Sequence, residues 1–402
     1  MGRVGGAEPH AIRATANVRL SSEARERGAA AEAGQGARHN EMDSSRFLDG
    51  ARSLGCCTPG QQELLMTTVA TLGIDLAKNV FQLHGVDACG KVVLRKRVMR
   101  DQLLASLANL PPCLIGMETC GGAHHFARQA QALGHTVRLM SAQYVKPYVK
   151  SQKNDCVDAE AICEAVGRPS MRFVPIKSPE QQDVLAIHRV RAQLVKWRTM
   201  LTNQARGLAA ERGFVARQGA SGFKHALPLW LECEQMSDVL RELLTDLRER
   251  LTQLEERIHH LDVQLERIAN TDERAKRLLA IEGIGPLTAS AFVAAVGNPT
   301  SFKNGRHVGA WLGLVPRQDS SGGKSKLLGL SKHGDRYLRT LLIHGARSAI
   351  QRCATKTDAR SRWLQALKTR AGVNKAACAL ANKNARIAWA LLARGQTYRA
   401  PG

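Results

Sequence analysis

The sequence predicts an α/β region followed by a mainly α-helical one. Three observations lead to this prediction. Short β-rich runs separated by turn signals begin at Thr67, and the later ones alternate with helical patterns. Past residue 180, apolar residues recur at spacings of three and four. From Leu240 to Ile268, Leu and Ile alternate four and three residues apart without a break, which is typical of a coiled coil.

The α/β part reads as a mixed sheet of roughly 100 residues with helices packed on it. Turn signals such as Cys89-Gly90 separate the first strands, and Pro111 and Gly134 end two of the helices. Strands are expected over 67–77, 80–88, 91–100, 113–120 and 135–142. Helices are expected over 101–110, 123–133 and 155–167.

The helical middle has two long amphipathic stretches. The first carries Ile187, Leu194 and Leu201 among basic residues, and the second carries the Leu240–Ile268 series. Antiparallel pairing of the two, with dimerisation through the same seam, is one interpretation. A single long helix packed inside its own chain is the other.

Composition shifts divide the chain into five segments. Residues 1–65 are rich in Gly, Ala, Arg, Glu and Ser, so we expect a disordered tail or an extension upstream of a natural start at Met66. An α/β domain is expected over 66–175 and a helical dimerisation region over 176–272. A C-terminal domain with a long Gly-, Ser- and Lys-rich loop follows over 273–395, and a tail over 396–402.

The charge balance indicates a nucleic-acid partner. Lys and Arg total 58 against 35 Asp and Glu, a formal charge of +23. No apolar run is long enough to span a bilayer, and the first 30 residues have no secretory signal, so we expect a cytoplasmic, nucleoid-associated protein and no membrane partner. The ten cysteines form no C-x-x-C pair, which argues against zinc. Aromatic residues are 4% of the chain, so phosphate contacts are expected to dominate over base stacking.

An acidic set stands out in the α/β part. Asp75 interrupts an apolar strand, Glu118 follows another apolar run, and Asp155 and Asp158 share one face at the start of a helix. Four converging carboxylates repel one another unless cations lie between them, and oxygen ligands of this kind suit hard divalent ions. Two such ions would stabilise the attacking and leaving oxygens of a phosphodiester displacement.

Each acid also has a structural explanation. Asp155 could cap its helix, Asp158 could interact with the helix dipole, and Asp75 could end its strand in a turn. Individually these explanations are at least as good as the functional one. The ordered combination of a strand Asp, a strand-end Glu and a helical Asp pair favours the metal site.

Two further segments indicate contact with phosphates. In IEGIGPLTASAFVAAVG (281–297), Gly283 and Gly285 allow a tight turn before a helix opened by Pro286, which resembles the hairpin of a helix-hairpin-helix DNA-backbone binder. The same G-x-G pattern also occurs as plain tight packing.

The second segment is the loop at 313–339. Ser320 and Ser321 precede two glycines, and basic residues follow at Lys324, Lys326, Lys332, Arg336 and Arg339. A serine hydroxyl among cations is either a phosphate contact or a nucleophile that attacks a phosphodiester. From spacing alone, a flexible basic loop that binds phosphates is favoured.

Several motifs in this order carry a resemblance to a known family. GIDLAKNVFQLHGVD, METCGGAHHFA, KNDCVDAEAI, IEGIGPLTA, GLVPRQDSSGGK and LSKHGDRYLRTLLIHGAR resemble the DEDD transposases of bacterial insertion sequences, in the insertion-sequence one-ten family. The resemblance covers roughly 67–395. It leaves the first 65 residues outside, which supports Met66 as the start.

The resemblance implies an RNase H-like, resolvase-type N-terminal domain, a coiled-coil middle and a C-terminal transposase domain. By motif, it implies that Asp75, Glu118, Asp155 and Asp158 hold Mg²⁺ and that Ser321, or the adjacent Ser320, links covalently to DNA. It further implies that the enzyme acts on element ends and target DNA as a homodimer or homotetramer. A structured guide RNA from the element's non-coding end is implied as a partner.

Three rival functions remain on the residues alone. A Holliday-junction resolvase or simple nuclease would share the acids and metal ions but use water in place of serine. A nucleotide-binding enzyme of the actin and sugar-kinase type would need further Gly-rich motifs, which the sequence does not show. A non-enzymatic DNA binder would leave the four-acid pattern as coincidence.

Overall fold

A computed structural model describes residues 68–150 and 155–399 of the chain, and the side chain of Asp155 lies outside that description. All described residues belong to one unit of the chain, residues 57–402. The predicted extension over 1–65 therefore lies outside the described residues.

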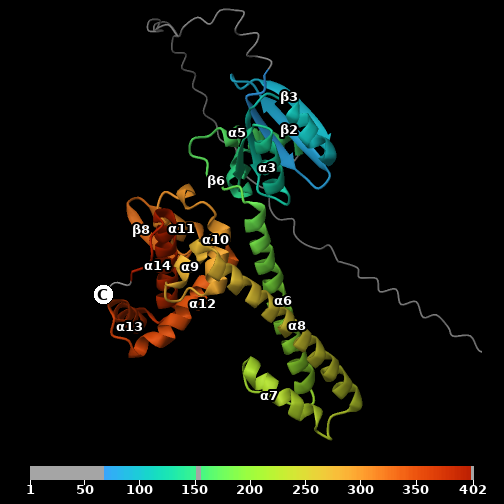
Figure 1. The fold of residues 1–402 in the computed structure, drawn as a ribbon, viewed down its shortest axis with the longest axis vertical. Helices are drawn as coiled ribbons and strands as arrows, with labels where there is room; N and C mark the ends of the chain where they lie inside the picture. Colours follow the sequence, from blue (N-terminus) through green and yellow to red (C-terminus); the bar gives the residue numbers. More distant parts are fainter. Residues whose placement is uncertain (1–67, 151–154, 400–402) are drawn as a thin grey trace, which may run out of the picture. The chain divides into compact units, whose positions relative to one another are not determined.

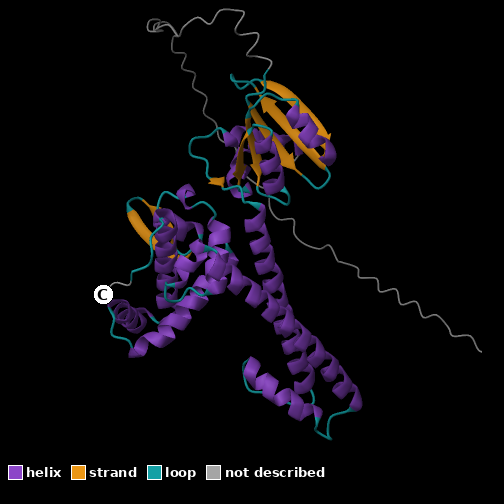
Figure 2. Ribbon diagram, in the orientation of Figure 1, coloured by secondary structure: helices purple, strands orange, loops and turns teal. Residues whose placement is uncertain are grey.

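The α/β part is built on a six-stranded mixed sheet with the order β3-β2-β1-β4-β5-β6 (Figures 1 and 2). β1, β2 and β3 form an antiparallel meander, β4 and β5 run parallel to β1, and β6 is antiparallel to β5. The strands are Thr71–Leu76, Val80–Val86, Val92–Met99, Leu114–Glu118, Thr136–Met140 and Phe173–Val174. Five of the six lie where the sequence predicts them. β6 has two residues, too few to leave a periodic signal.

Helices cover both faces of this sheet. Side chains alternate along each strand, so Ile74 of β1 and Met117 of β4 face a core shared with α2 (Leu103–Ala108) and α3 (Ala123–Ala132). α5 (Asp155–Val166) packs on the opposite face, against β1, β2 and β4. The short α4 (Ala142–Val145) precedes it, and Val145 joins the core beneath α5. The 3-10 turns η1 and η2 span Arg100–Gln102 and Lys146–Tyr148.

Two long helices follow, α6 (Pro179–Ala210) and α8 (Asp238–Thr271), with α7 (Ala220–Leu231) between them. Ser178 and Gln181 form a capping box that starts α6. The helices lie side by side (Figure 1). They are antiparallel, as the ion pair between Arg191 near the start of α6 and Asp262 near the end of α8 shows. At their other ends, Ala205 and Ala209 of α6 share a core with the first part of α8.

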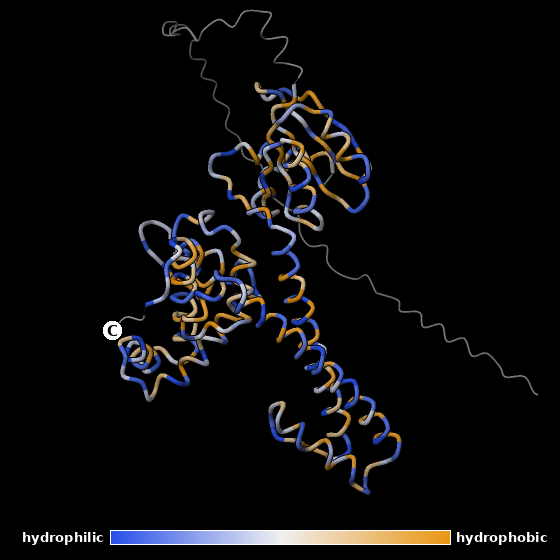
Figure 3. The backbone as a smooth tube through the Cα atoms, viewed as in Figure 1, coloured by the Kyte–Doolittle hydropathy of each residue, from blue (hydrophilic) through white to orange (hydrophobic). Residues whose placement is uncertain are grey.

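The leucine seam of α8 is largely covered by this same chain. Leu240, Leu244, Leu247 and Leu251 are buried in a core with α6 and α7. Figure 3 shows apolar and polar residues alternating along both long helices, as expected of amphipathic helices with one buried face. The antiparallel pairing is therefore present, and dimerisation through the seam stays a prediction.

The C-terminal part is a helical core that carries one hairpin. The hairpin strands are β7 (Pro316–Ser321) and β8 (Lys324–Leu330). Apolar residues of α9, α10, α11, α12, α13 and α14 form a single core. These helices span Glu273–Leu279, Pro286–Val296, Gly305–Trp311, Arg336–Arg352, Ala359–Ala371 and Val373–Arg394, with 3-10 turns η3 at Pro299–Ser301 and η4 at Cys353–Thr355. Among the described residues, no helix combines the length and apolar character needed to cross a bilayer.

Candidate functional site

Strand pairing brings Asp75 and Glu118 to neighbouring positions. β1 and β4 are parallel, with Gly73 opposite Gly116 and Ile74 opposite Met117. Asp75 and Glu118 are the next residues of the two strands. Since Ile74 and Met117 face the α2/α3 core, Asp75 and Glu118 face the other side of the sheet, where α5 packs.

Two glycines let α5 approach this edge of the sheet closely. A Cβ added to Gly73 would lie 2.2 Å from the carbonyl oxygen of Ala159, and one added to Gly116 would lie 2.8 Å from Cβ of Val166. Any larger residue would push α5 away from the strands. Asp158 immediately precedes Ala159, so this close packing holds Asp158 near the strand carboxylates.

The direction of α5 places its first turn beside the acids. Sγ of Cys163 lies 3.5 Å from the carbonyl oxygen of Thr71, at the start of β1. Sγ of Cys156 lies 3.7 Å from Oε1 of Gln82, which is paired with Asp75. The helix therefore runs antiparallel to β1, with its N-terminal end at the carboxyl ends of β1 and β4. Asp155 is the first residue of that helix.

The electrostatics agree with this placement of the described acids. Burial, then the negative charges of Asp75 and Asp158, raise the pKa of Glu118. Burial, then Asp75 and Glu118, likewise raise the pKa of Cys120. Carboxylates perturb a neighbour in this way only at close range. Three of the four predicted acids therefore share one half-buried region, in which each added negative charge is unfavourable.

A cation would relieve this repulsion, and the oxygen donors suit a hard divalent ion. Within the described residues, however, no three His, Cys, Asp or Glu side chains are grouped tightly enough to hold an ion. The side chain of Asp155 lies outside that set. Cys120 also lies near these carboxylates, and the sequence alone did not single it out. Its position two residues after Glu118 could have indicated this.

The predicted serine loop is an ordered β-hairpin. β7 and β8 are joined by a two-residue turn, Gly322 and Gly323, whose φ angles are +55° and +76°. Positive φ at both positions is the geometry that a tight hairpin turn requires and that glycine supplies without strain. The expectation of a loop was thus wrong, since both sides of the turn are β-strands. The Gly-Gly pair was the available signal, but the flanking strands carry no apolar alternation.

Both candidate serines are exposed at the end of this hairpin. Ser320 is opposite Ser325 and Ser321 is opposite Lys324. Oγ of Ser320 accepts hydrogen bonds from Nε2 of Gln318 at 2.9 Å and from the backbone N–H of Lys326 at 3.4 Å. The hydroxyl of Ser320 is therefore held within the hairpin, while Ser321 stands next to the glycine turn.

The basic residues after the serines separate into two groups. Lys324, Lys326, Lys332 and Arg336 are exposed, and Lys332 has the left-handed φ of +57°. Arg339 is 8% exposed, and its Nη1 donates to the carbonyl oxygens of Leu312 and His333. Arg339 therefore stabilises the segment before α12, a structural role that its position in the sequence did not indicate.

The glycines of the 281–297 segment also have different surroundings. Gly283 has φ of +88°, and a Cβ on it would lie 2.9 Å from the carbonyl oxygen of Gly345 in α12. The backbone at Gly283 is thus packed against α12, which matches the tight-packing explanation of the G-x-G pattern. Gly285 is exposed at the N-cap of α10, with open space around it. This turn joins α9 to α10, and of its two glycines Gly285 is the exposed one.

Comparison with known proteins identifies the family. Residues 72–211 match the DEDD family model described as "Transposase", and residues 275–362 match the model described as "Transposase IS116/IS110/IS902 family". The chain is 53% identical to a Pseudomonas aeruginosa protein named "Probable family 20 transposase", over 83% of this chain and 99% of the relative.

Two further relatives agree with this match. The chain is 48% identical to the transposase for insertion sequence element IS1111A of Coxiella burnetii, over 83% of this chain and 92% of the relative. It is 44% identical to the transposase for insertion sequence element IS1328 of Yersinia enterocolitica, over 83% of this chain and 99% of the relative. The resemblance seen in the sequence is confirmed, and the chain belongs to the IS110/IS116/IS902 family of insertion-sequence DNA transposases.

Proposed function

We propose that this transposase cleaves and exchanges DNA strands with two sets of residues, a carboxylate site that holds Mg²⁺ and a serine nucleophile. The convergence of Asp75, Glu118 and Asp158 where α5 meets β1 and β4 is the observation that carries the proposal. The sheet order, with three antiparallel strands followed by two parallel ones, supports an RNase H-like assignment for this domain. Asp155, the first residue of α5, would complete the set.

The carboxylates would act by holding a divalent cation where α5 meets β1 and β4. Asp75 and Glu118 stand on adjacent strands and Asp158 on the helix above them, so their oxygens would bind a divalent cation from two sides. When bound, Mg²⁺ supplies positive charge to a phosphodiester that reacts beside it. The glycine-mediated contact of α5 with the sheet would keep the carboxylates in place through the reaction.

Ser321 would provide the attacking oxygen. Its Oγ forms a bond to phosphorus as a P–O bond to deoxyribose breaks, and the departing oxygen takes up a proton to become a hydroxyl. The product is a phosphoserine link that preserves the phosphodiester energy for strand exchange. Exposed Lys324, Lys326, Lys332 and Arg336 would bind the flanking phosphates, with Gly285 at the start of α10 as a further backbone contact.

A structured guide RNA and a homo-oligomer are further parts of the proposal. The charge of +23 favours binding of either nucleic acid. For assembly, Leu251 is already buried within the chain, so the exposed apolar residues of α6 are the better candidates. Trp197 is 46% exposed and lines a groove of about 300 Å³ with Met200 and Leu254. Trp197→Asp should lower the mass of the oligomer measured by analytical ultracentrifugation. Val215→Asp, at another exposed apolar residue, should leave it unchanged.

The decisive experiment is capture of a covalent protein–DNA adduct. The full chain, Mg²⁺, DNA with the element junction and the adjacent non-coding RNA would be run on a denaturing gel, and the adducted peptide sequenced. We expect an adduct on Ser321 that Ser321→Ala and Asp75→Asn abolish and that Ser325→Ala, on the facing strand, leaves intact. An adduct on Ser320 would move the nucleophile by one residue. Cleaved DNA without an adduct would instead favour water as the nucleophile, as in a junction resolvase.

A further inference from the structure

Two neighbouring basic pockets lie on one side of α14, away from the serine hairpin in sequence. One, of about 710 Å³, is lined by Arg360, Lys383, Arg399 and Tyr398, and we call it the Arg360 pocket. The other, of about 640 Å³, is lined by Arg306, Arg386 and Trp363, and we call it the Trp363 pocket. Lys383 and Ile387 line both, so the two pockets adjoin. No Asp or Glu lines either one in the described part of the chain.

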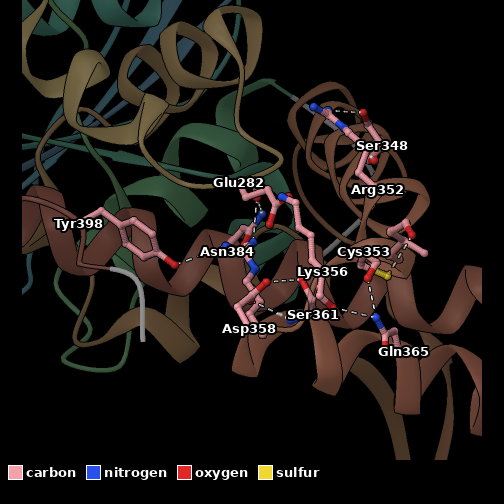
Figure 4. A network of polar contacts seen from close by, with 12 residues as sticks. Glu282, Ser348, Arg352, Cys353, Lys356, Asp358, Ser361, Gln365, Asn384 and Tyr398 are labelled. Carbon is pink, nitrogen blue, oxygen red and sulfur yellow. Dashed lines mark hydrogen bonds and ion pairs between the residues drawn. The ribbon is translucent and has the colours of Figure 1, made fainter. Parts of the chain in front are cut away.

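Arg360 is a buried cation whose hydrogen-bond partners are all neutral oxygens. It is 6% exposed. Its Nη2 donates to the carbonyl oxygen of Glu282 at 2.8 Å and to Oδ1 of Asn384 at 2.7 Å, and its Nη1 donates to the hydroxyl of Tyr398 at 3.3 Å. Figure 4 shows Glu282, Asn384 and Tyr398 converging from separate segments. Nε of Arg360 is buried with no hydrogen-bond partner among the described residues.

The nearby carboxylates are engaged elsewhere. The carboxylate of Glu282 pairs with Nζ of Lys356 at 2.6 Å, and Oδ2 of Asp358 accepts from the hydroxyl of Ser361 at 2.6 Å (Figure 4). A buried guanidinium is unfavourable without a counter-charge. Among the described residues no carboxylate pairs with Arg360, so an anion from outside the chain would supply the missing counter-charge.

The other groups around the pocket are donors. Since the hydroxyl of Tyr398 accepts from Arg360, its own proton is available for another acceptor. Nζ of Lys383 lies 4.5 Å from the ring centroid of Trp363, a cation–π contact that holds the ammonium where both pockets can use it. An anion in the Arg360 pocket would meet a guanidinium, an ammonium and a hydroxyl, which together suit phosphate oxygens.

We propose that the Arg360 pocket binds a backbone phosphate of a nucleic-acid strand, and that the adjoining Trp363 pocket binds the next phosphates along that strand through Arg306 and Arg386. This inference rests on the proposed function only for the source of the phosphate, since a transposase works on DNA. The pockets would anchor the strand and take no part in bond breaking.

The test measures binding of short labelled oligonucleotides, one DNA and one RNA, to the full chain without Mg²⁺ over a range of salt concentrations. Arg360 also bonds to Glu282, Asn384 and Tyr398, so its replacement would disturb the fold. The variants are therefore Lys383→Gln and Arg399→Gln. Exposed Lys375→Gln and Arg394→Gln, which line neither pocket, are the matched controls. The double pocket variant should bind about tenfold more weakly, and its slope of log affinity against log salt should fall by about 1 to 2, one contact per phosphate.

The outcomes separate the sources of the phosphate. A loss with DNA alone, RNA alone or both supports the proposal and names the strand. If inorganic phosphate raises the melting temperature of wild type but not of the double variant, and all oligonucleotides bind equally, the pocket holds a free anion and the nucleic-acid assignment is overturned. Equal behaviour of pocket and control variants overturns it too. Asp75→Asn should bind the oligonucleotides like wild type, so failure of the carboxylate mechanism would not be mistaken for failure here.

Discussion

The acidic region and the serine hairpin differ in how the fold positions them. Asp75, Glu118 and Asp158 come from two strands and a helix in direct backbone contact, and all three are half-buried. Ser320 and Ser321 stand on a two-stranded hairpin in which every residue of β7 is exposed. The carboxylates are thus preorganised by packing, whereas the hairpin is fixed by its turn and would gain its final position from the DNA. Changes in the two regions should therefore have different signatures.

The largest effect is expected from Asp75→Asn. Asp75 is a proposed ligand of the divalent ion, so its loss should cost several kcal/mol of transition-state stabilisation, about a thousandfold in strand-transfer rate. The loss of this negative charge should also lower the pKa of Glu118 towards its ordinary value. Strand transfer on a junction DNA measures the rate, with Asp101→Asn as the control at an exposed acid on the same domain. A rate near that of the control would remove Asp75 from the site.

Gly73→Ala tests the preorganisation itself. Its Cβ would lie 2.2 Å from the carbonyl oxygen of Ala159, so α5 must move. We expect a loss of about 3 kcal/mol or more in the free energy of unfolding and a matching loss of activity. Gly121→Ala is the control, since a Cβ there meets nothing within 4 Å. Equal denaturation midpoints for the two variants would show that α5 does not depend on this contact.

His188 tests how α6 is joined to α10 and α12. Its Nδ1 lies 3.0 Å from the hydroxyl of Tyr337 in α12 and its Nε2 lies 3.1 Å from Oγ of Ser290 in α10. Burial, then the charge of Arg191, lower the pKa of His188 to about 4, against the opposing effect of Asp262. His188→Ala should destabilise by about 1–3 kcal/mol at neutral pH, because the buried hydroxyls of Tyr337 and Ser290 each lose one hydrogen bond.

The pH dependence sharpens this test. The unfolded histidine binds a proton below about pH 6.5 and the folded one only below about pH 4, so stability is lost as the pH falls between these values. His188→Ala should remove part of that dependence, and the lowered pKa of His124 would supply much of the remainder. Exposed His259→Ala should leave the curve unchanged. A wild-type slope in the His188 variant would contradict the buried, neutral state.

The smallest effect on stability is expected at the hairpin turn. Gly323 has φ of +76°, which costs an alanine about 1 kcal/mol locally. The melting temperature of Gly323→Ala should stay near wild type because the hairpin has no buried face, while strand transfer should fall. Gly329→Ala has open space and no left-handed φ, so it should retain activity. A large fall in melting temperature would show that the hairpin is part of the core.

The two regions also differ in how far the sequence predicts them. Short apolar, β-rich runs identified β1 and β4. The carboxylate inside the first run and the one after the second identified Asp75 and Glu118. Their adjacency depends on parallel pairing of strands some 40 residues apart, which no local pattern encodes. The β7–β8 hairpin was missed because an exposed strand needs no apolar face. Arg339 and Gly283 were predicted to contact nucleic acid, but Arg339 is bonded to Leu312 and Gly283 is packed against Gly345. These contacts arise from tertiary packing, which the local sequence does not encode.

Direct measurement of metal binding tests whether the converging carboxylates form a cation site. Mn²⁺, which shares the oxygen-ligand preference of Mg²⁺, would be titrated into the full chain and the free ion followed by electron paramagnetic resonance. We expect wild type and Asp101→Asn to bind Mn²⁺ alike, and Asp75→Asn and Glu118→Gln to bind it at least tenfold more weakly. Equal binding by all four proteins, or none by wild type, would contradict the proposed cation site.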